Sequence, residues 1–328
     1  APFVLGGKEV FTSVSIGIAL SSPNYEQPDE ILRDADTAMY RAKSLGKARF
    51  EVFDADMRAS VMARLQLETD LRRALERREF SNFYQPIVDL ASGDIAGFEA
   101  LLRWRHPTRG LLGPGEFIAV AEETGLIREL GWWNLGEACR QISEWRTSSK
   151  SHSHLTVSVN LSAKQFLQPN LVQEIGNLLK ESGLPAEALK LEITESTVMG
   201  DPSAAVEMLQ QIKALGIRLA IDDFGTGYSS LSYLHRFPLD TLKIDRSFIS
   251  DINADGEGME IARTILPMAN NLRLDVIAEG VETIEQVLLL KKLQCKYGQG
   301  FYFSRPLSAE GITALLTGDL AWQAEQSK

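Results

Sequence analysis

Between about residue 80 and residue 303, the sequence alternates short runs of β-branched and apolar residues with longer amphipathic stretches, several of which end near a glycine. This alternation predicts parallel βα units, since each helix carries the chain back to the start of the next strand. Eight runs are present, the number that closes a (β/α)8 barrel. They are residues 83–90, 95–104, 155–161, 189–194, 217–221, 241–244, 274–278 and 297–303.

The first two runs are separated only by Ala91-Ser92-Gly93-Asp94. A polar turn this short joins antiparallel strands and leaves no room for a crossover helix. One strand must therefore run against the others. We expect an α/β fold built on an irregular TIM-type (β/α)8 barrel with one antiparallel strand.

The first part of the chain does not follow this rhythm. Residues 10–20 are rich in β-branched residues, residues 29–44 have an amphipathic helical pattern with Asp29 as expected N-cap, and residues 55–78 are again helical. A few strands and one helix bury too little surface to be stable alone, so we expect a fragment of another α+β domain, cut from a longer parent. The predicted division is residues 1–54 for that fragment, 55–64 for a linker helix region and 65–328 for the barrel.

The composition limits the classes of protein that fit. A net charge of −10 and a pI near 5.1 argue against the broad basic surface that binds a nucleic-acid polymer. We find no apolar run long enough to span a membrane and no secretion signal. The two cysteines, Cys139 and Cys295, lack metal-ligand spacing and indicate a reduced compartment. We therefore expect a cytoplasmic protein.

Polar side chains stand where several of the apolar runs end. In a barrel, the C-terminal ends of the parallel strands form the mouth of the active site, so these side chains are candidates for chemistry. Taken singly, each has another explanation, because an acid at a helix start can cap the helix or stabilise its dipole, and a lysine can pair with one acid. The candidates are Glu99 within the second run, then Asn160, Glu192, Asp222, Asp223, Lys243, Glu279 and Gln299.

Together, the carboxylates predict metal ions. Several acids at one barrel mouth repel each other, and Lys243 alone cannot balance them, whereas divalent cations would. Oxygen and amide ligands without cysteine or clustered histidine favour Mg2+ or Mn2+ over zinc. The adjacent acids Asp222 and Asp223 are suited to serving two ions, as in two-metal cleavage of phosphodiesters.

These residues lie in motifs that resemble the EAL domain family of cyclic di-GMP phosphodiesterases. The signature corresponds to Glu99-Ala100-Leu101, and the resemblance extends from about residue 65 to residue 315. Further matching blocks are Tyr84-Gln85-Pro86-Ile87, Val159-Asn160-Leu161-Ser162, Glu192-Ile193-Thr194-Glu195, Asp222-Asp223-Phe224-Gly225-Thr226-Gly227, Lys243-Ile244-Asp245 and Ala278-Glu279-Gly280-Val281-Glu282.

The resemblance implies a role for each of these positions. The catalytic groups would be Lys243, Glu279 and Glu99, with Lys243 holding or helping to deprotonate the attacking water and Glu279 acting as a metal-linked general base. Substrate contacts would come from Gln85, Arg103 and Gln299. Two Mg2+ or Mn2+ ions would be bound by Glu99, Asn160, Glu192, Asp222, Asp223, Glu279 and Glu282.

Residues 224–232 follow the paired acids and are rich in Gly, Ser and Thr, which predicts a mobile loop over the site. The segment resembles the regulatory loop of the family, and Glu195 matches the glutamate that anchors it. The triplet Asp223-Phe224-Gly225 also occurs in kinases, but no kinase glycine loop or catalytic loop accompanies it.

The N-terminal part resembles the last third of a GGDEF domain, through residues 11–19 and 34–43. The GGDEF signature itself is absent. Gly6-Gly7-Lys8-Glu9-Val10 lies too close to the final strands to be the active-site loop of that family. The resemblance therefore implies no cyclase activity for this chain.

The complete ligand set favours an enzyme, a cyclic-guanylate-specific phosphodiesterase that hydrolyses cyclic di-GMP to linear pGpG in bacterial second-messenger signalling. The alternative is a catalytically silent cyclic di-GMP receptor on the same barrel, although such receptors usually lack some of the ligands. An enolase-like barrel with Lys243 as base belongs to another reaction class and would turn over carboxylic acids. The resemblance also allows a homodimer formed through the barrel.

Overall fold

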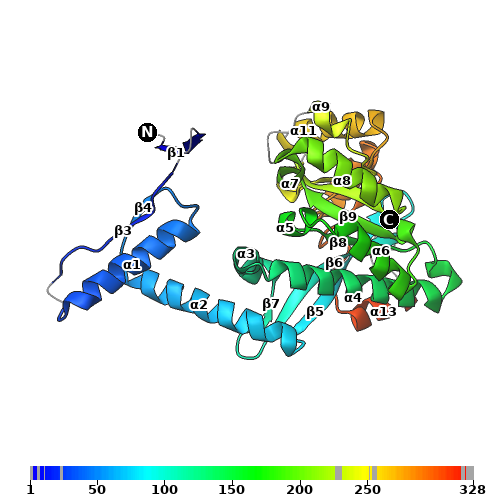
Figure 1. Ribbon diagram of the computed structural model, residues 1–328. Helices are drawn as coiled ribbons and strands as arrows, with labels where there is room; N and C mark the ends of the chain where they lie inside the picture. The colour runs from blue at the N-terminus through cyan, green and yellow to red at the C-terminus, as the bar shows by residue number, and fades with distance from the viewer. Residues whose placement is uncertain are drawn as a thin grey trace. The chain divides into compact units, whose positions relative to one another are not determined.

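The computed structural model describes residues 3–5, 8–10, 12–22, 25–225, 231–250, 252, 257–318 and 322 of the 328-residue chain. The chain divides into two compact units, Ala1–Glu76 and Arg77–Lys328 (Figure 1). Among the residues described, no helix is both long and apolar enough to cross a membrane.

The described residues of the first unit form two small sheets and two helices. β1 (Phe3–Leu5) pairs antiparallel with β2 (Lys8–Val10), and β3 (Ile16–Ile18) pairs parallel with β4 (Phe50–Val52). α1 (Pro28–Ser44) contacts β3, β4 and α2 (Ala55–Glu76). Gly17 allows α1 to approach β3 closely, because a Cβ at Gly17 would lie 1.9 Å from the carbonyl oxygen of Ala35.

The helix predicted over residues 29–44 begins at Pro28, and its predicted N-cap, Asp29, is wrong. Gln27 is the N-cap, and Pro28 takes the first helical position, where its missing N–H removes no helical hydrogen bond. The Glu30 carboxylate accepts hydrogen bonds from the backbone N–H groups of Glu26 (2.9 Å) and Gln27 (3.4 Å). Asp29 instead lies in the first turn, where its charge stabilises the helix dipole.

The second unit is built on a closed barrel of eight strands. Their hydrogen-bonded order is β5, β13, β12, β11, β10, β9, β8 and β6, and pairing of β5 with β6 closes the ring. β5 runs antiparallel to both β6 and β13, whereas the other neighbours pair in parallel, which confirms the predicted irregular barrel. The bounds are β5 (Phe80–Asp89), β6 (Ile95–His106), β8 (Thr156–Asn160), β9 (Leu189–Thr194), β10 (Arg218–Phe224), β11 (Thr241–Ile244), β12 (Asp275–Ala278) and β13 (Tyr297–Gly298).

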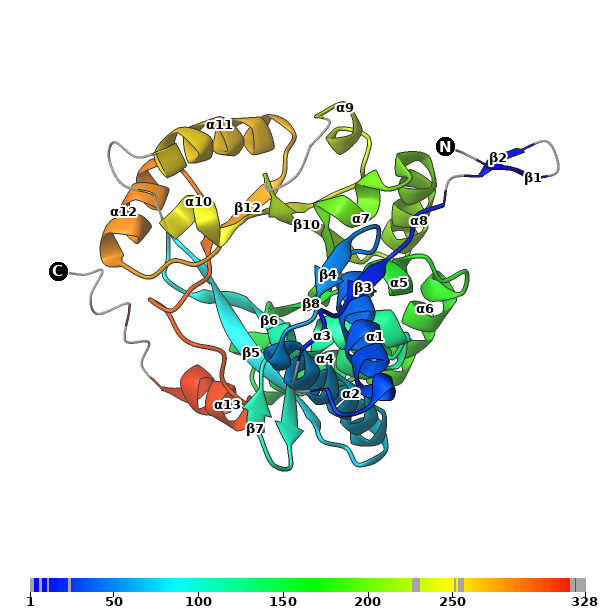
Figure 2. The ribbon, with the colours of Figure 1, turned by 90° about the vertical axis from the view of Figure 1, so that its left-hand side faces the viewer.

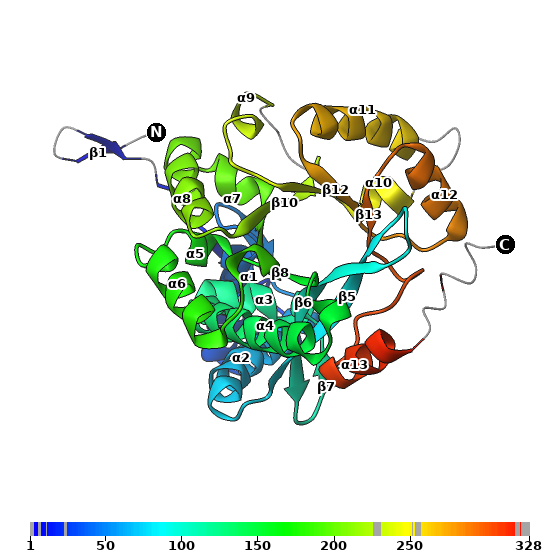
Figure 3. The same ribbon diagram turned by 90° about the vertical axis from the view of Figure 1, so that its right-hand side faces the viewer.

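Helices surround the barrel strands, as two views along the barrel show (Figure 2, Figure 3). A short strand, β7 (Gly110–Leu112), extends the sheet by pairing antiparallel with β6. The helices are α3 (Pro114–Thr124), α4 (Ile127–Ser148), α5 (Ala163–Phe166), α6 (Leu171–Ser182), α7 (Glu195–Met199), α8 (Pro202–Ala214), α9 (Leu231–Leu234), α10 (Arg246–Ser250), α11 (Glu257–Asn271), α12 (Ile284–Lys292) and α13 (Ala309–Thr317), with 3-10 turns at Lys150–His152 and Ala186–Ala188.

The two faces of the barrel strands differ in chemistry. On β9, Leu189, Leu191 and Ile193 belong to the apolar core between the strands and the helices. Because side chains alternate along a strand, Lys190 and Glu192 face the interior of the barrel. Both are buried, at 6% and 1% exposure. The interior of this barrel is therefore polar along β9, with Lys190 near the amino end of the strand and Glu192 nearer its carboxyl end.

The last predicted run, residues 297–303, is mostly not a strand. β13 covers only Tyr297–Gly298, and the residues that follow it form backbone hydrogen bonds with Val281 instead of continuing the strand. The N–H of Gln299 donates to the carbonyl of Ala278 (2.9 Å), and the N–H of Val281 donates to the carbonyl of Gln299 (3.0 Å). Only glycine fits at position 300, because a Cβ there would lie 2.0 Å from the carbonyl oxygen of Val281.

Candidate active site

A cavity of about 630 Å³ opens at the carboxyl ends of the parallel strands. Active sites of (β/α)8 barrels form at this end because the loops that follow the strands meet there. Predicted site residues from early and late parts of the chain line this cavity together. They are Gln85, Glu99, Asp222, Lys243, Glu279, Glu282 and Gln299.

Four carboxylates from different strands converge on the ammonium group of Lys243. The Nζ atom lies 2.6 Å from Glu192 Oε2 and 2.6 Å from Glu279 Oε1. It also lies 3.3 Å from Asp222 Oδ1 and 3.4 Å from Glu99 Oε2. Lys243 is 1% exposed, so this cluster is withdrawn from water and its charges act strongly on each other.

The negative charge of the cluster exceeds what one lysine balances. Burial, together with the charges of Glu99 and Asp222, raises the pKa of Glu192 to about 8 although Lys243 opposes the shift. Burial and the same two acids raise the pKa of Glu279 to about 7. Burial alone would lower the pKa of Lys243, but Glu192 and Glu279 hold it well above its usual value. Lys243 is therefore a fixed cation, whereas Glu192 and Glu279 titrate near neutral pH.

Glu99 is held by a chain of side-chain amides. Its burial would raise the pKa, but Lys243, Gln299 and Asn160 together keep the pKa of Glu99 below its usual value. Asn160 Nδ2 donates to Glu99 Oε1 (2.8 Å), and Gln299 Nε2 donates to Glu99 Oε2 (2.6 Å). Gln299 Nε2 also donates to Gln85 Oε1 (3.1 Å), and Gln85 Nε2 donates to the carbonyl of Ser304 (3.1 Å). These bonds keep Glu99 ionised and fix its orientation.

The paired acids at the end of β10, Asp222 and Asp223, differ in their exposure to solvent. Asp222 is buried and faces Lys243, whereas Asp223 is exposed. The backbone of Asp223 has a φ of 54°, and its N–H donates to Asp222 Oδ1 (3.0 Å). Left-handed backbone is uncommon outside glycine and clusters at functional sites, where it redirects a side chain. Partial desolvation by neighbouring atoms and the charges of Asp222 and Asp245 raise the pKa of Asp223, although the residue is exposed as a whole.

The donor set fits divalent cations. Glu192 Oε1 is buried and has no hydrogen-bond partner among the described residues, an arrangement that leaves a buried carboxylate oxygen for a cation. Carboxylate and amide oxygens are the ligands that Mg2+ and Mn2+ prefer. In this conformation the Lys243 ammonium stands among the acids. Within the described ranges, no group of three or more His, Cys, Asp or Glu side chains is spaced to hold a metal ion.

Two further predicted residues, Glu282 and Glu195, lie around this cluster rather than in it. Glu282 lines the cavity and makes no ion pair to Lys243. Glu195 is buried, and its Oε2 accepts a hydrogen bond from the N–H of Gly225 (3.3 Å), at the start of the predicted loop 224–232. Most of that loop, residues 226–230, lies outside the described residues, so the loop remains a prediction.

Arg103 is not among the residues that line the cavity. Its guanidinium lies 5.6 Å from the centre of the Phe83 ring, and its Nη1 donates to the carbonyl of Leu102 (2.9 Å). Burial lowers the pKa of Arg103, and the negative charge of Glu99 partly offsets the shift.

Part of the cavity wall was not predicted from the sequence. Arg246 and Ser247, at the start of α10, line the cavity, as do Phe301 and Pro306. The signal for the first two was present, since they directly follow Asp245 at the end of β11, where the mouth residues of a barrel are found. Gly280, which has a φ of 69°, brings the chain against Arg246, because a Cβ at Gly280 would lie 2.5 Å from Arg246 Cβ.

Comparison with known families matches both parts of the chain. Residues 68–306 match the family described as the EAL domain, and residues 1–49 match the family described as diguanylate cyclase, GGDEF domain. The chain is thus a barrel protein of the EAL type with a GGDEF segment ahead of the barrel.

Two relatives come from Pseudomonas aeruginosa. The cyclic di-GMP phosphodiesterase NbdA is 42% identical over 315 residues, which are 96% of this chain and 40% of the relative. The bifunctional diguanylate cyclase/cyclic di-GMP phosphodiesterase MucR is 44% identical over 313 residues, which are 95% of this chain and 45% of the relative. The chain spans less than half the length of these two curated relatives.

Solved structures are similar over the barrel. The PaMucR phosphodiesterase in complex with c-di-GMP is 46% identical, with a TM-score of 0.73, and the match covers 75% of this chain and 99% of that one. The FimX EAL domain from Pseudomonas aeruginosa, bound to c-di-GMP, is 27% identical, with a TM-score of 0.66 over 74% of this chain and 96% of that one. The chain belongs to the EAL domain family, which confirms the resemblance identified from its motifs.

Proposed function

We propose that this chain is a phosphodiesterase that hydrolyses cyclic di-GMP to linear pGpG. The observation that carries the proposal is the convergence of four buried carboxylates on Lys243 at the mouth of a cavity of about 630 Å³. Support comes from a phosphodiesterase solved with c-di-GMP, to which the chain is 46% identical.

The proposal includes two divalent ions, Mg2+ or Mn2+. When bound, they would polarise a phosphoryl oxygen and lower the pKa of a water molecule, the chemistry that metal-dependent phosphodiesterases use. The residues that would hold them are Glu99, Asn160, Glu192, Asp222, Asp223, Glu279 and Glu282. The orphaned Glu192 Oε1 and the raised pKa values of Glu192 and Glu279 support this assignment, because a cation would satisfy the oxygen and favour both ionised forms.

In the proposed reaction, the oxygen of a water molecule forms a bond to phosphorus as the bond between phosphorus and the 3′-oxygen breaks. The water gives up a proton, and the departing 3′-oxygen takes one. Glu279 suits the role of general base, since its carboxylate lines the cavity and a bound cation would keep it ionised and able to accept a proton. Lys243, 2.6 Å from Glu279 Oε1, holds that carboxylate and offers an ammonium donor to the water.

Gln85 and Gln299 are proposed to contact the substrate from the cavity wall. Their amides already orient Glu99, so one hydrogen-bonded chain would link substrate position to the catalytic cluster. Arg103 is proposed to bind a phosphate through its fork of N–H donors. That contact requires the guanidinium to leave the Phe83 ring.

Chromatographic separation of products tests the proposal. The purified chain with cyclic di-GMP and Mg2+ or Mn2+ is expected to form linear pGpG, and the product is expected to disappear with chelator and in Glu99→Ala. Glu181→Ala, at an exposed position on α6, is the matched control and should retain full activity. Absence of any product from the intact chain under all metal conditions contradicts the proposal.

The silent receptor is the second candidate, because relatives with this barrel have been solved with c-di-GMP bound, and binding alone does not require turnover. Saturable binding of cyclic di-GMP without conversion would support the receptor. The complete set of carboxylates around Lys243 favours the enzyme.

Glu195 is proposed to anchor the loop at residues 224–232 through its contact with Gly225. Glu195→Ala is expected to lower both turnover and metal affinity without unfolding the barrel. Unchanged turnover in that variant would refute the anchoring role, and circular dichroism would check that the barrel is intact.

Three wider predictions belong to the same proposal. The division into residues 1–54, 55–64 and 65–328 assigns the reaction to the last part. A cytoplasmic location is consistent with the free, buried thiols of Cys139 and Cys295. A homodimer formed through the barrel stays a prediction that sedimentation of the chain would test.

A further inference from the structure

A second cavity, of about 340 Å³, opens into the opposite end of the barrel, at the amino ends of the parallel strands. Its wall is drawn from strands all around the ring. Its acidic and basic residues are Asp89, Asp94, His154, Lys190, Arg218 and Asp275. This cavity shares no lining residue with the candidate active site. On β12, the buried Ile277 lies between Asp275 at this end of the barrel and Glu279 at the other.

Lys190 is the unusual group in this cavity. It is 6% exposed, faces the barrel interior and makes no hydrogen bond or ion pair with any described residue. A buried ammonium without a partner is costly, and proteins normally satisfy such a group with an anion or a polar ligand. The neighbouring strand places Arg218 in register with Lys190, and Arg218 likewise has no ion pair in the described part of the chain.

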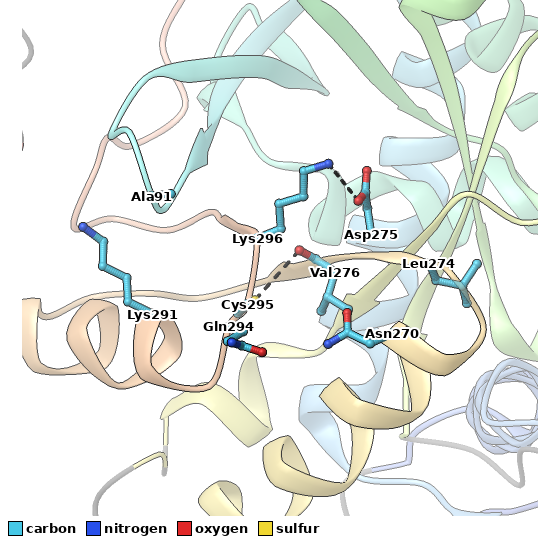
Figure 4. A pocket seen from close by; sticks show the side chains of 9 residues that line it. All are labelled: Ala91, Asn270, Leu274, Asp275, Val276, Lys291, Gln294, Cys295 and Lys296. Carbon is cyan, nitrogen blue, oxygen red and sulfur yellow. Dashed lines mark hydrogen bonds and ion pairs between the residues drawn. The ribbon is translucent and has the colours of Figure 1, made fainter.

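Each acid of this cavity interacts with groups other than Lys190 and Arg218. Asp275 Oδ1 lies 2.8 Å from Lys296 Nζ in a neighbouring cavity of about 430 Å³ (Figure 4), and Asp275 lines both cavities. The Asp89 carboxylate accepts hydrogen bonds from the backbone N–H groups of Ala91 (2.9 Å) and Ser92 (3.1 Å). Asp94 also has an interaction of its own.

The remaining basic group, His154, uses Nε2 for a hydrogen bond with the carbonyl of Ile95 (3.0 Å). Among the described residues of the cavity wall, Lys190 and Arg218 are therefore the cations whose side-chain donors make no hydrogen bond or ion pair. An ammonium beside a guanidinium is a pair that binds an oxyanion, because both groups are charged donors and the guanidinium presents two parallel N–H bonds.

We propose that this cavity binds a small oxyanion, either inorganic phosphate or the phosphate group of a small monoester, between Lys190 and Arg218. The volume lies at the lower end of the range of small-molecule sites, which suits phosphate or a compact phosphorylated molecule. The ligand supplies a direct contact to the Lys190 ammonium, which Glu192 and Asp275 influence only through their charge, and it enters from the end of the barrel opposite to the candidate active site.

Titration calorimetry of the full chain with inorganic phosphate tests this site. Chelator is present throughout, so that metal-dependent binding of phosphate at the barrel mouth does not contribute. The intact chain is expected to bind phosphate saturably. Lys190→Met and Arg218→Gln should each weaken binding about tenfold or more, because each removes a charge-assisted contact.

Two control variants locate the site. Lys180→Met, at an exposed position on α6, and Glu99→Ala, in the candidate active site, should both bind phosphate like the intact chain. A parallel titration with glycerol 3-phosphate distinguishes the sources, since tighter binding than phosphate identifies a monoester as the ligand and equal or weaker binding identifies phosphate.

Three results overturn the proposal: no saturable binding of either probe, unchanged affinity in both Lys190→Met and Arg218→Gln, or loss of binding only in Glu99→Ala. Since Lys190 is buried, Lys190→Met is checked by circular dichroism. If that variant does not fold, Arg218→Gln, at an exposed position, decides the question alone.

Discussion

Replacing Lys243 by methionine removes the ammonium at the centre of the candidate active site and keeps an unbranched side chain that is one atom shorter. Glu192 and Glu279 each lose a partner at 2.6 Å, and Glu192 is 1% exposed, so water cannot replace the lost contact. Removing one partner of a buried ion pair costs about 3–5 kcal/mol because the other charge is left uncompensated. We expect Lys243→Met to lose that much of its free energy of unfolding near pH 8 without metal, and to lose turnover.

Urea denaturation in chelator, followed by circular dichroism, measures this effect. The double variant Lys243→Met with Glu192→Gln should recover part of the lost stability, because it removes a charge that the single variant strands. Lys180→Met, which is exposed, serves as the control and should change stability little. A loss below about 1 kcal/mol for Lys243→Met, or turnover like that of the intact chain, would refute the reasoning.

The remaining predictions concern pH, thiols and one glycine. In the metal-free chain, the pKa values of Glu192 (about 8) and Glu279 (about 7) lie above the unperturbed 4.5, so their contribution to stability is full below that value and is lost as the pH rises through 7 and 8. Urea denaturation should therefore give a lower free energy of unfolding near pH 8 than near pH 5, and the opposite order would contradict the assignment. Burial raises the pKa of Cys139 and of Cys295 to about 12, so a thiol reagent near pH 8 should modify neither until urea unfolds the chain. Gly280→Ala should destabilise the barrel by about 1–3 kcal/mol, because the backbone there has a φ of 69° and a Cβ would lie 2.5 Å from a neighbouring side-chain carbon; a melting temperature equal to that of the intact chain would count against this.

The barrel was predictable because its strands have a strong local signature. β9 and β11 have the predicted bounds, Leu189–Thr194 and Thr241–Ile244, since each is a compact run that the barrel buries. The antiparallel strand also followed from the sequence, because the short turn at residues 91–94 leaves only one possible direction for the returning chain.

Features that depend on specific neighbours or on long-range contacts were harder to predict from the sequence. The end of β13 depends on the close approach of Gly300 to Val281, which no local pattern encodes. The start of α1 depends on Pro28, whose preference for the first helical position outweighed the capping tendency of Asp29.

Some residues of the candidate site could be predicted from local sequence, whereas Lys190 in the second cavity could not. Glu99, Glu192 and Glu279 were found because acids that close apolar runs must meet at the barrel mouth. Lys190 was not singled out, although it faces the same interior as Glu192, two residues away on β9. Its importance depends on how the strands surround it: no described residue forms a hydrogen bond or ion pair with it, which only the three-dimensional arrangement reveals.

The most direct test of the central claim is hydrolysis of cyclic di-GMP in water enriched in heavy oxygen, with the products weighed by mass spectrometry. The account predicts linear pGpG that carries one heavy oxygen on its 5′-phosphate, because the oxygen of water bonds to phosphorus and the 3′-oxygen leaves. Recovery of unchanged cyclic di-GMP, or of a product without the label, would contradict the assignment of this site as a phosphodiesterase.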